Sequence, residues 1–296
     1  MAVYSCSFAS SAVTYYEMGG RFGDHLIEYL HAKWFSYSLG LPLLYKPFKY
    51  SKEFKLDDLE EPWTKEKEKS FLHVKELKSA DSIQDSTLYL IPFFSESPDD
   101  YRFGTIPFAI NWRDPTFQSI LRTAFTPKKQ RPNHPFPPLE NLLTVALHVR
   151  RGGGADPKNA HEKWPLRFAP DSYYIESLRI ISDLFPSRPI YVYIFTDDLD
   201  PGRVADKYAE ALLDLPIQFN CRREGNHHSL NIIEDFLAMM EFDCLIRSTS
   251  NYSFLPAMIG QYRVVISPKH FTWRLGEDGM TKENYIDQKE ILMPLF

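Results

Sequence analysis

The sequence has few cysteines and no surplus of positive charge. Only three of its 296 residues are cysteines, and Cys6, Cys221 and Cys244 lie far apart, without CxxC or zinc-ligand spacing. Such a sparse, odd-numbered set argues against a disulfide framework and is typical of a reducing compartment. The formal net charge is −5. This argues against non-specific nucleic-acid binding, because that binding needs a basic face to displace counterions.

The sequence also lacks long apolar runs and several well-known catalytic signatures. No window reaches the roughly 20 apolar residues of a membrane span, and the N-terminus does not have the pattern of a signal peptide. We therefore expect no membrane span and a cytoplasmic location. No P-loop, GxSxG or HExxH motif occurs. The glycines of GGRFGDHL (19–26) do not match the GxGxxG of nicotinamide sites, so no cofactor is predicted.

Apolar residues are plentiful, at 44% of the chain, which is enough for a sizeable core. In the second half, short apolar runs alternate with helical patterns, and near-continuous apolar strands are typical of a sheet covered on both faces. We predict an α/β fold with a parallel, doubly wound sheet there. The predicted strands are Leu142–Val149, Ile190–Phe195, Cys244–Ile246 and Val264–Ile266; the predicted helices cover Asp171–Phe185 and the residues after Asn231, where Glu234 completes a capping signal.

The first half is less regular. A Gly-rich turn and a long helix are predicted over Gly19–Leu39, with candidate strands at Leu41–Tyr45 and Leu88–Phe93. The mixed-charge stretch Lys52–Lys78 is expected to form a solvated surface.

A proline-rich stretch separates the two halves. TPKKQRPNHPFPP (126–138) contains five prolines and no apolar periodicity, which predicts a linker. We therefore expect two domains, 1–138 and 139–296.

The stretch VALHVRRGGGAD (145–156) places two arginines and three glycines directly after a predicted strand. Ligands of parallel sheets bind beyond the carboxyl ends of the strands. Arg150 and Arg151 are at such an end, and the glycines from Gly152 onward allow the backbone to approach a ligand closely. Arginine can hold a phosphate through two parallel hydrogen bonds. The pattern therefore fits a phosphate or carboxylate site, and it also fits a solvated turn.

In IFTDDLDPGR, acidic residues follow another predicted strand. Asp197 and Asp198 could accept hydrogen bonds from a nucleobase edge or a ribose. Asp198 and Asp200 also form a D-x-D pattern that could hold Mg²⁺ or Mn²⁺. For Asp200 the pattern favours a helix N-cap, because Pro201 follows at the first helical position.

Three further segments have polar residues next to predicted loops or helices. In RSTSNYSFLPAMIG (247–260), hydroxyls and free N–H groups at a helix start fit either an anion site or an ordinary cap. In GGRFGDHL, Arg21 and Asp24 could place a cation and a carboxylate beside a reacting centre, and Asp24 could equally cap the helix. His227 and His228 are predicted to lie in a solvated loop, with no metal site.

Taken in order, these segments resemble the fucosyltransferase superfamily, which uses GDP-fucose. His148-Val149-Arg150-Arg151 resembles its H-x-R-R loop, GGRFGDH its N-terminal Gly loop, IFTDD its S/T-D-D segment, and RSTSNYSFLPAMIG its third motif. The resemblance covers about residues 17–268. It implies a GT-B architecture, with two Rossmann-like domains facing across a cleft, and transfer with inversion and without metal.

The resemblance also implies roles for individual residues. Arg150 would bind the β-phosphate and stabilise the departing GDP, and Arg21 and Asp24 are further catalytic candidates at the donor–acceptor junction. The implied donor-binding residues are His148, Arg151, Gly152, Asp197, Asp198, Ser250, Asn251, Ser253, Phe22 and Gly23. A guanidinium can neutralise a leaving diphosphate in place of a metal ion.

The sequence departs from the family pattern at two places. Asp156 comes three positions later than the acidic residue that follows R-R-G in many relatives, and Asp24 replaces the usual Asn or Cys-Gln. A transferase that uses another GDP-sugar, or a non-catalytic binder of nucleotide or sugar, therefore stays open. The acceptor, whether glycan, peptide or small molecule, is not predicted.

Overall fold

The computed structural model divides the chain into two compact units, Met1–Arg131 and Pro132–Phe296. Most of the predicted linker, together with Gly154, His227 and His228, lies outside the described residues. The structure describes residues 10–17, 19–77, 83–92, 110–129, 141–153, 156–163, 167–224, 226, 229–276 and 279–292.

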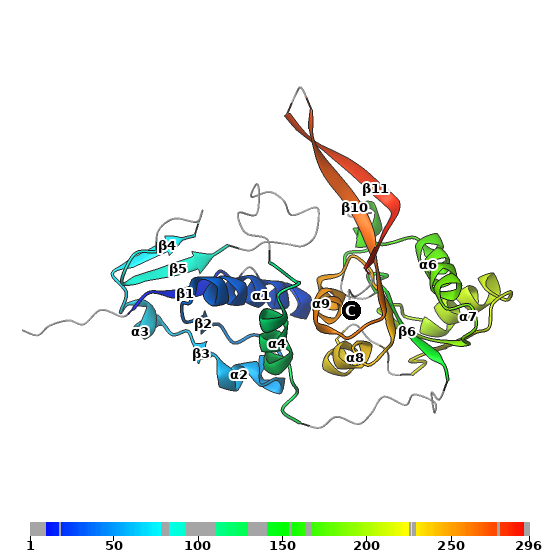
Figure 1. The fold of residues 1–296 in the computed structure, drawn as a ribbon, viewed down its shortest axis with the longest axis horizontal. Coiled ribbons are helices and arrows are strands. Elements are labelled where there is room, and N and C mark those ends of the chain that lie inside the picture. The colour runs from blue at the N-terminus through cyan, green and yellow to red at the C-terminus, as the bar shows by residue number, and fades with distance from the viewer. Residues whose placement is uncertain are drawn as a thin grey trace, which may run out of the picture. The chain divides into compact units, whose positions relative to one another are not determined.

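The second unit is built on a six-stranded sheet with the strand order β11-β10-β9-β6-β7-β8. Figure 1 labels β6, β10 and β11 of this sheet. Every neighbouring pair is parallel except β10 and β11, which form an antiparallel ribbon. The strands are β6 (Leu143–Val149), β7 (Ile190–Thr196), β8 (Ile217–Cys221), β9 (Cys244–Ile246), β10 (Val264–Gly276) and β11 (Gly279–Leu292).

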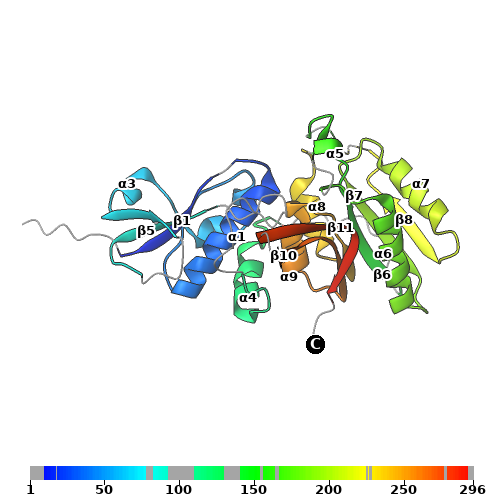
Figure 2. The ribbon, with the colours of Figure 1, turned by 90° about the horizontal axis from the view of Figure 1, so that it is seen from above.

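Helices cover both faces of this sheet, which explains why its central strands are apolar along nearly their whole length. On β7, Val192 packs into the core shared with α6 (Asp171–Leu184) and α7 (Pro201–Ala211). Its neighbour Tyr193 packs on the opposite face, in the core shared with α8 (Ile232–Met239) and α9 (Phe254–Ile259). Successive side chains of a strand point to opposite faces, so a strand that is buried on both faces has few polar residues. Figure 2 shows α6 and α7 beside β6–β8.

The structure corrects the sequence analysis at three points of this unit. Strand β8 was not predicted, because it is an edge strand in which only Cys221 is fully buried. Strand β10 pairs with β9 only over Val264–Ile266, the predicted range, and continues to Gly276 in the ribbon with β11. Helix α8 begins after Asn231 as predicted, but Asn231 has a left-handed backbone (φ 56°) and its side chain makes no capping hydrogen bond.

The first unit is a smaller α/β layer. Its parallel strands β1 (Ala12–Tyr15), β5 (Thr87–Ile91) and β4 (His73–Glu76) form one sheet, and β2 (Leu44–Tyr45) pairs with β3 (Glu61–Pro62). A parallel bridge between Val13 and Leu43 connects the two. The helices are α1 (Phe22–Leu39), α2 (Leu56–Leu59), α3 (Lys65–Glu68) and α4 (Pro115–Ala124), with a short 3-10 turn at Ser51–Glu53; the second unit also contains α5 (Ala160–Lys163).

The mixed-charge stretch Lys52–Lys78 is more structured than predicted. It is largely exposed, but it supplies β3 and β4 to the sheets, and Phe54 and Leu56 are fully buried. Within the described residues, no helix combines the length and the apolar character needed to cross a membrane. The two α/β units with parallel strands confirm the predicted α/β class. The facing of the two domains across a cleft stays a prediction.

Candidate functional site

The carboxyl ends of three neighbouring strands in the second unit gather the predicted donor-binding residues. β6 and β7 end together, with Val149 opposite Thr196, so Arg150 and Asp197 both follow at the same edge. β9 lies on the other side of β6, with Ile246 opposite Leu147. Arg247 therefore leaves β9 at this edge as well. Parallel pairing brings residues about 50 and 100 positions apart into one cluster, where α/β proteins bind ligands.

Arg150 is held in place without using all of its hydrogen-bond donors. Its Nη2 atom lies 2.8 Å from Oδ2 of Asp156, and the two side chains are only 11% and 10% exposed. The guanidinium also lies over the Phe168 ring, 5.4 Å from its centroid. Its Nε–H is buried and has no hydrogen-bond partner in the described part of the chain. A buried, unsatisfied donor is costly, so a ligand acceptor at this position would stabilise the site.

The carboxylate partner of Arg150 lies only six residues further along the chain. Nη2 of Arg150 donates a hydrogen bond to Oδ2 of Asp156.

Arg151 forms its ion pair with a different carboxylate from that of Arg150. Its Nη2 donates to the carboxylate of Asp171 and to the hydroxyl of Tyr208, the latter at 2.9 Å. Burial pushes the pKa of Asp171 upward, but the bonds from Lys207 and Tyr208 and the charge of Arg151 outweigh it and lower that pKa to about 2. We therefore expect Arg151 to anchor the loop onto α6 and α7 rather than to contact the donor.

Asp197 holds the backbone of the arginine loop. Its two carboxylate oxygens accept hydrogen bonds from the N–H groups of Arg151 (2.5 Å) and Gly152 (3.0 Å). Gly152 has a left-handed backbone (φ 76°), and a Cβ on Gly153 would stand 1.7 Å from the carbonyl oxygen of Asp197. No side chain fits at that distance, so the successive glycines are a steric requirement of this loop. The predicted contact of Asp197 with guanosine stays a prediction.

His148 is buried and neutral. Burial, followed by the charges of Arg150 and Arg247, lowers its pKa from 6.5 to about 3. Its Nδ1 lies 3.2 Å from the hydroxyl oxygen of Ser248, and its ring packs against Tyr252 with centroids 5.5 Å apart. An uncharged imidazole between two guanidinium groups leaves the positive charge of this edge on the arginines.

The acidic residues after β7 take part in the local turn. Asp200 accepts from the N–H of Arg203 at 3.1 Å, which confirms its predicted role as the N-cap of α7. Asp198 accepts from the N–H of Asp200 at 2.9 Å, and its own N–H donates to Thr196. Among the described residues, no group of three or more His, Cys, Asp or Glu side chains is arranged to hold a metal ion.

The third motif forms a compact turn after β9. Ser250 accepts from the N–H of Tyr252 at 3.3 Å and so caps a short 3-10 turn, Asn251–Ser253, which leads into α9. The buried hydroxyl of Ser253 donates to the carbonyl of Ser250 at 3.3 Å. Ser250 therefore has the capping role, one of the two alternatives that the sequence left open for this segment. The phosphate contacts of Ser250, Asn251 and Ser253 stay predictions.

In the first unit, the Gly-rich loop leads directly into α1. The N–H of Arg21 donates to Oδ2 of Asp24 at 2.9 Å, so the carboxylate satisfies a backbone donor at the helix start. Phe22 is buried and stacks on Phe54 with ring centroids 6.2 Å apart. Gly23 is also buried.

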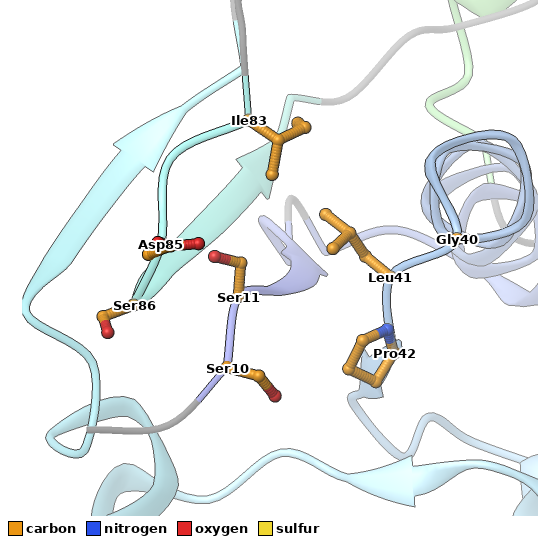
Figure 3. Close-up of a pocket in the computed structure, with 8 residues that line it drawn as sticks. All are labelled: Ser10, Ser11, Gly40, Leu41, Pro42, Ile83, Asp85 and Ser86. Carbon is orange, nitrogen blue, oxygen red and sulfur yellow. The ribbon is translucent and has the colours of Figure 1, made fainter. Parts of the chain in front are cut away.

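A separate pocket of about 580 Å³ lies at the end of the first unit's sheet at which β1 and β5 begin (Figure 3). It surrounds the amino ends of β1 and β5 and the residues that follow α1, so it does not involve the strand ends at which ligands are expected. Its lining residues are Ser10, Ser11, Gly40, Leu41, Pro42, Ile83, Asp85 and Ser86.

The chain belongs to the class of proteins built from two α/β units with parallel strands. No family model and no curated protein matches it. A solved structure of Arabidopsis thaliana FUT1, a mutant in complex with GDP, covers 93% of this chain and 74% of its own length, with a TM-score of 0.53 at 10% identity. The fold is therefore fucosyltransferase-like.

Two other solved fucosyltransferases match with lower scores. Fucosyltransferase NodZ from Bradyrhizobium covers 93% of this chain and 98% of its own, with a TM-score of 0.47 at 11% identity. POFUT1 in its apo form covers 86% and 95%, with a TM-score of 0.43 at 12% identity.

Sequence reasoning assigned no role to Arg247 or Phe168. Arg247 donates from Nε to the carbonyl of Ser248 at 3.1 Å and lies over the Phe254 ring, 5.0 Å from its centroid. The sequence could have indicated a role for Arg247, because this residue follows an apolar strand just as Arg150 does. Phe168 had no signal, because it meets Arg150 only through the fold of the intervening loop.

Proposed function

We propose that the protein is a glycosyltransferase that moves a sugar, most simply L-fucose, from its GDP-activated form to an acceptor hydroxyl, with inversion and without a metal ion. The observation that carries this proposal is Arg150, fixed by Asp156 at the carboxyl end of β6 with a buried Nε–H still unsatisfied. The fucosyltransferase-like fold and the GDP bound by the Arabidopsis protein support the choice of donor.

The chemistry required of such a site is the stabilisation of a leaving diphosphate. As the bond between the sugar and the β-phosphate breaks, negative charge grows on the phosphate oxygen. A preorganised guanidinium stabilises this charge in a partly buried site more strongly than water does. Arg150 supplies that group, and the charge of Arg247 adds to the positive potential around His148. This concentration of positive charge is the basis for proposing that no metal is needed.

Nucleotide titration by calorimetry tests the donor assignment. We expect GDP to bind in preference to UDP and ADP, with EDTA having little effect on affinity. Equal binding of the three nucleotides would remove the GDP assignment, and loss of binding in EDTA would favour the D-x-D alternative at Asp198 and Asp200.

Substitution of Arg150 tests whether this residue binds GDP. A charge-assisted hydrogen bond contributes about 1.5–3 kcal/mol, so Arg150→Ala should weaken GDP binding roughly 10- to 150-fold. Arg179→Ala is the matched control, because Arg179 pairs with Asp214 on the exposed side of α6. Near-normal affinity and turnover in Arg150→Ala would remove this residue from the site.

A donor screen read by GDP release separates the remaining alternatives. Release from GDP-fucose above that from GDP-mannose supports fucose transfer, and the reverse order identifies another GDP-sugar. Tight GDP binding with no release from any donor would identify a non-catalytic binding protein.

A further inference from the structure

An exposed histidine of the second unit lies close to Arg150. His161 is on the short helix α5, and its ring stacks on Phe168 with centroids 3.8 Å apart and an interplanar angle of 20°. The guanidinium of Arg150 lies over the same Phe168 ring, 5.4 Å from its centroid. The distance from the imidazole to the guanidinium therefore cannot exceed these two distances combined. All three residues belong to the second unit, so their arrangement does not depend on the first.

The Phe168 ring is a fixed support for this histidine. It is only 7% exposed. At Gly152, whose backbone is left-handed, a Cβ would stand 3.1 Å from Cε1 of Phe168, so the ring packs directly against the backbone of the arginine loop. Ala160, next to His161, is buried and anchors α5. Close packing leaves little freedom to such groups, so the position of His161 relative to Arg150 is set by the fold of this unit.

A backbone carbonyl sets the tautomer of His161. Its Nε2 lies 2.9 Å from the carbonyl oxygen of Arg151. A carbonyl oxygen can only accept a hydrogen bond, so Nε2 carries the hydrogen, and in the neutral ring Nδ1 has the lone pair. Within the described residues, Nδ1 has no hydrogen-bond partner, and the side chain is exposed. An imidazole that is oriented through one nitrogen and open at the other can act as a base.

His148 is the other histidine whose side chain the structure describes in this unit, and it does not fit this role. It is buried, and its Nδ1 lies 3.2 Å from the hydroxyl oxygen of Ser248. Burial and the charges of the nearby arginines lower its pKa to about 3. A group with so low a pKa is a weak proton acceptor near neutral pH.

We propose that His161 is the general base of the transfer and takes the proton of the acceptor hydroxyl on Nδ1. The proposal rests on the proposed function. The acceptor oxygen forms a bond to the anomeric carbon of the donor, and the bond from that carbon to the phosphate oxygen breaks, its electron pair leaving with GDP. The hydroxyl proton goes to Nδ1 and then to water.

The stereochemistry of the proposed transfer explains why the base should stand apart from Arg150. In a transfer with inversion, the acceptor approaches the anomeric carbon from the side opposite the phosphate. The proton is therefore released about one sugar ring away from the group that binds the phosphate. The shared contact with Phe168 keeps His161 within that reach of Arg150.

Glu162, the next residue on α5, is the rival base. Its side chain is exposed and makes no hydrogen bond or ion pair with the described residues. Nothing in the described structure therefore orients this carboxylate. His161 is oriented twice, by the carbonyl of Arg151 and by the Phe168 ring.

The experiment measures GDP release from GDP-fucose with water, methyl β-D-galactoside or sodium azide as the nucleophile. Azide has no proton to lose, so its reaction needs no base. We expect His161→Gln to lower release with water and with the galactoside by 10²- to 10⁴-fold, the usual contribution of a general base. Release with azide and GDP affinity should stay within about 2-fold of the wild type, because Gln keeps an N–H group for the carbonyl of Arg151.

Two further variants complete the experiment. Exogenous imidazole should restore part of the rate with the galactoside in His161→Ala. His73→Gln, at an exposed position of β4, is the control and should match the wild type with all three nucleophiles.

The possible failures are distinguishable. If the wild type binds no GDP, the proposed function is wrong and the base role falls with it. If it binds GDP but releases none from GDP-fucose with any nucleophile, the chain is a binding protein and the base role is wrong. Release with azide alone would show that no base acts at the site.

The remaining outcomes concern the base role alone. Near-normal release with water and the galactoside in His161→Gln overturns it. An equal loss with azide would show that His161 only holds the loop in place, and this also overturns the base role. A loss confined to Glu162→Gln assigns the base to Glu162.

Discussion

Acidification should lower the free energy of opening of the second unit's sheet, because His148 can take up a proton once it is exposed. The pKa of this histidine is lowered from 6.5 to about 3 by burial and by the charges of Arg150 and Arg247. Between pH 6.5 and pH 3, His148 binds a proton in the unfolded chain but not in the folded chain. Stability is therefore complete above pH 6.5 and falls as the pH decreases toward 3.

The magnitude follows from the size of the shift. Each pKa unit corresponds to about 1.36 kcal/mol. Between pH 7 and pH 5, His148 should therefore lower the free energy of opening by about 2 kcal/mol. The side chain is almost fully buried, so solvent screening reduces this value little.

Native-state hydrogen exchange of the β6 segment, read by mass spectrometry, measures this free energy. This free energy is measured for the wild type and for His148→Gln at pH 7, 6 and 5. Only its change with pH is compared between the two proteins, because the substitution itself alters packing at every pH. The wild type should lose about 2 kcal/mol more than the variant. An identical pH dependence in both proteins would refute the reasoning, since it would place the titrating group elsewhere.

Substitutions at three positions test the remaining geometry. Gly153→Ala should lower the unfolding free energy by about 1–3 kcal/mol and weaken GDP binding, because the new Cβ would meet the carbonyl oxygen of Asp197 at 1.7 Å; unchanged melting would contradict this contact. Asp200→Ala should cost about 1 kcal/mol in denaturant unfolding and Asp200→Ser much less, with GDP affinity kept in both; affinity lost in both would show that Asp200 binds ligand. Arg151→Ala should lower stability by about 1–3 kcal/mol through the loss of its bond to Asp171, and change GDP affinity less than Arg150→Ala does. Equal losses of GDP affinity would show that both arginines bind the donor.

Much of the second unit's fold was predictable, because its central strands are buried on both faces. β6 and β7 are apolar along nearly their whole length, and that signal does not depend on which neighbours cover them. The cap at Asp200 was also predictable, since the Asp-Pro pair and the helix start are adjacent in the sequence. Edge strand β8 escaped prediction because one side of an edge strand has no partner, so its residues are less apolar.

The sequence by itself determined which residue types stand at the ends of the parallel strands, because apolar runs and the polar residues after them are local features. Only the tertiary structure decided what those residues do. Arg150 and Arg151 are adjacent in the chain, yet one pairs with Asp156 beside an unsatisfied donor and the other with Asp171 on α6. Side chains of neighbouring residues at a strand end project in opposite directions, and their partners come from segments whose approach depends on the packing of the whole unit.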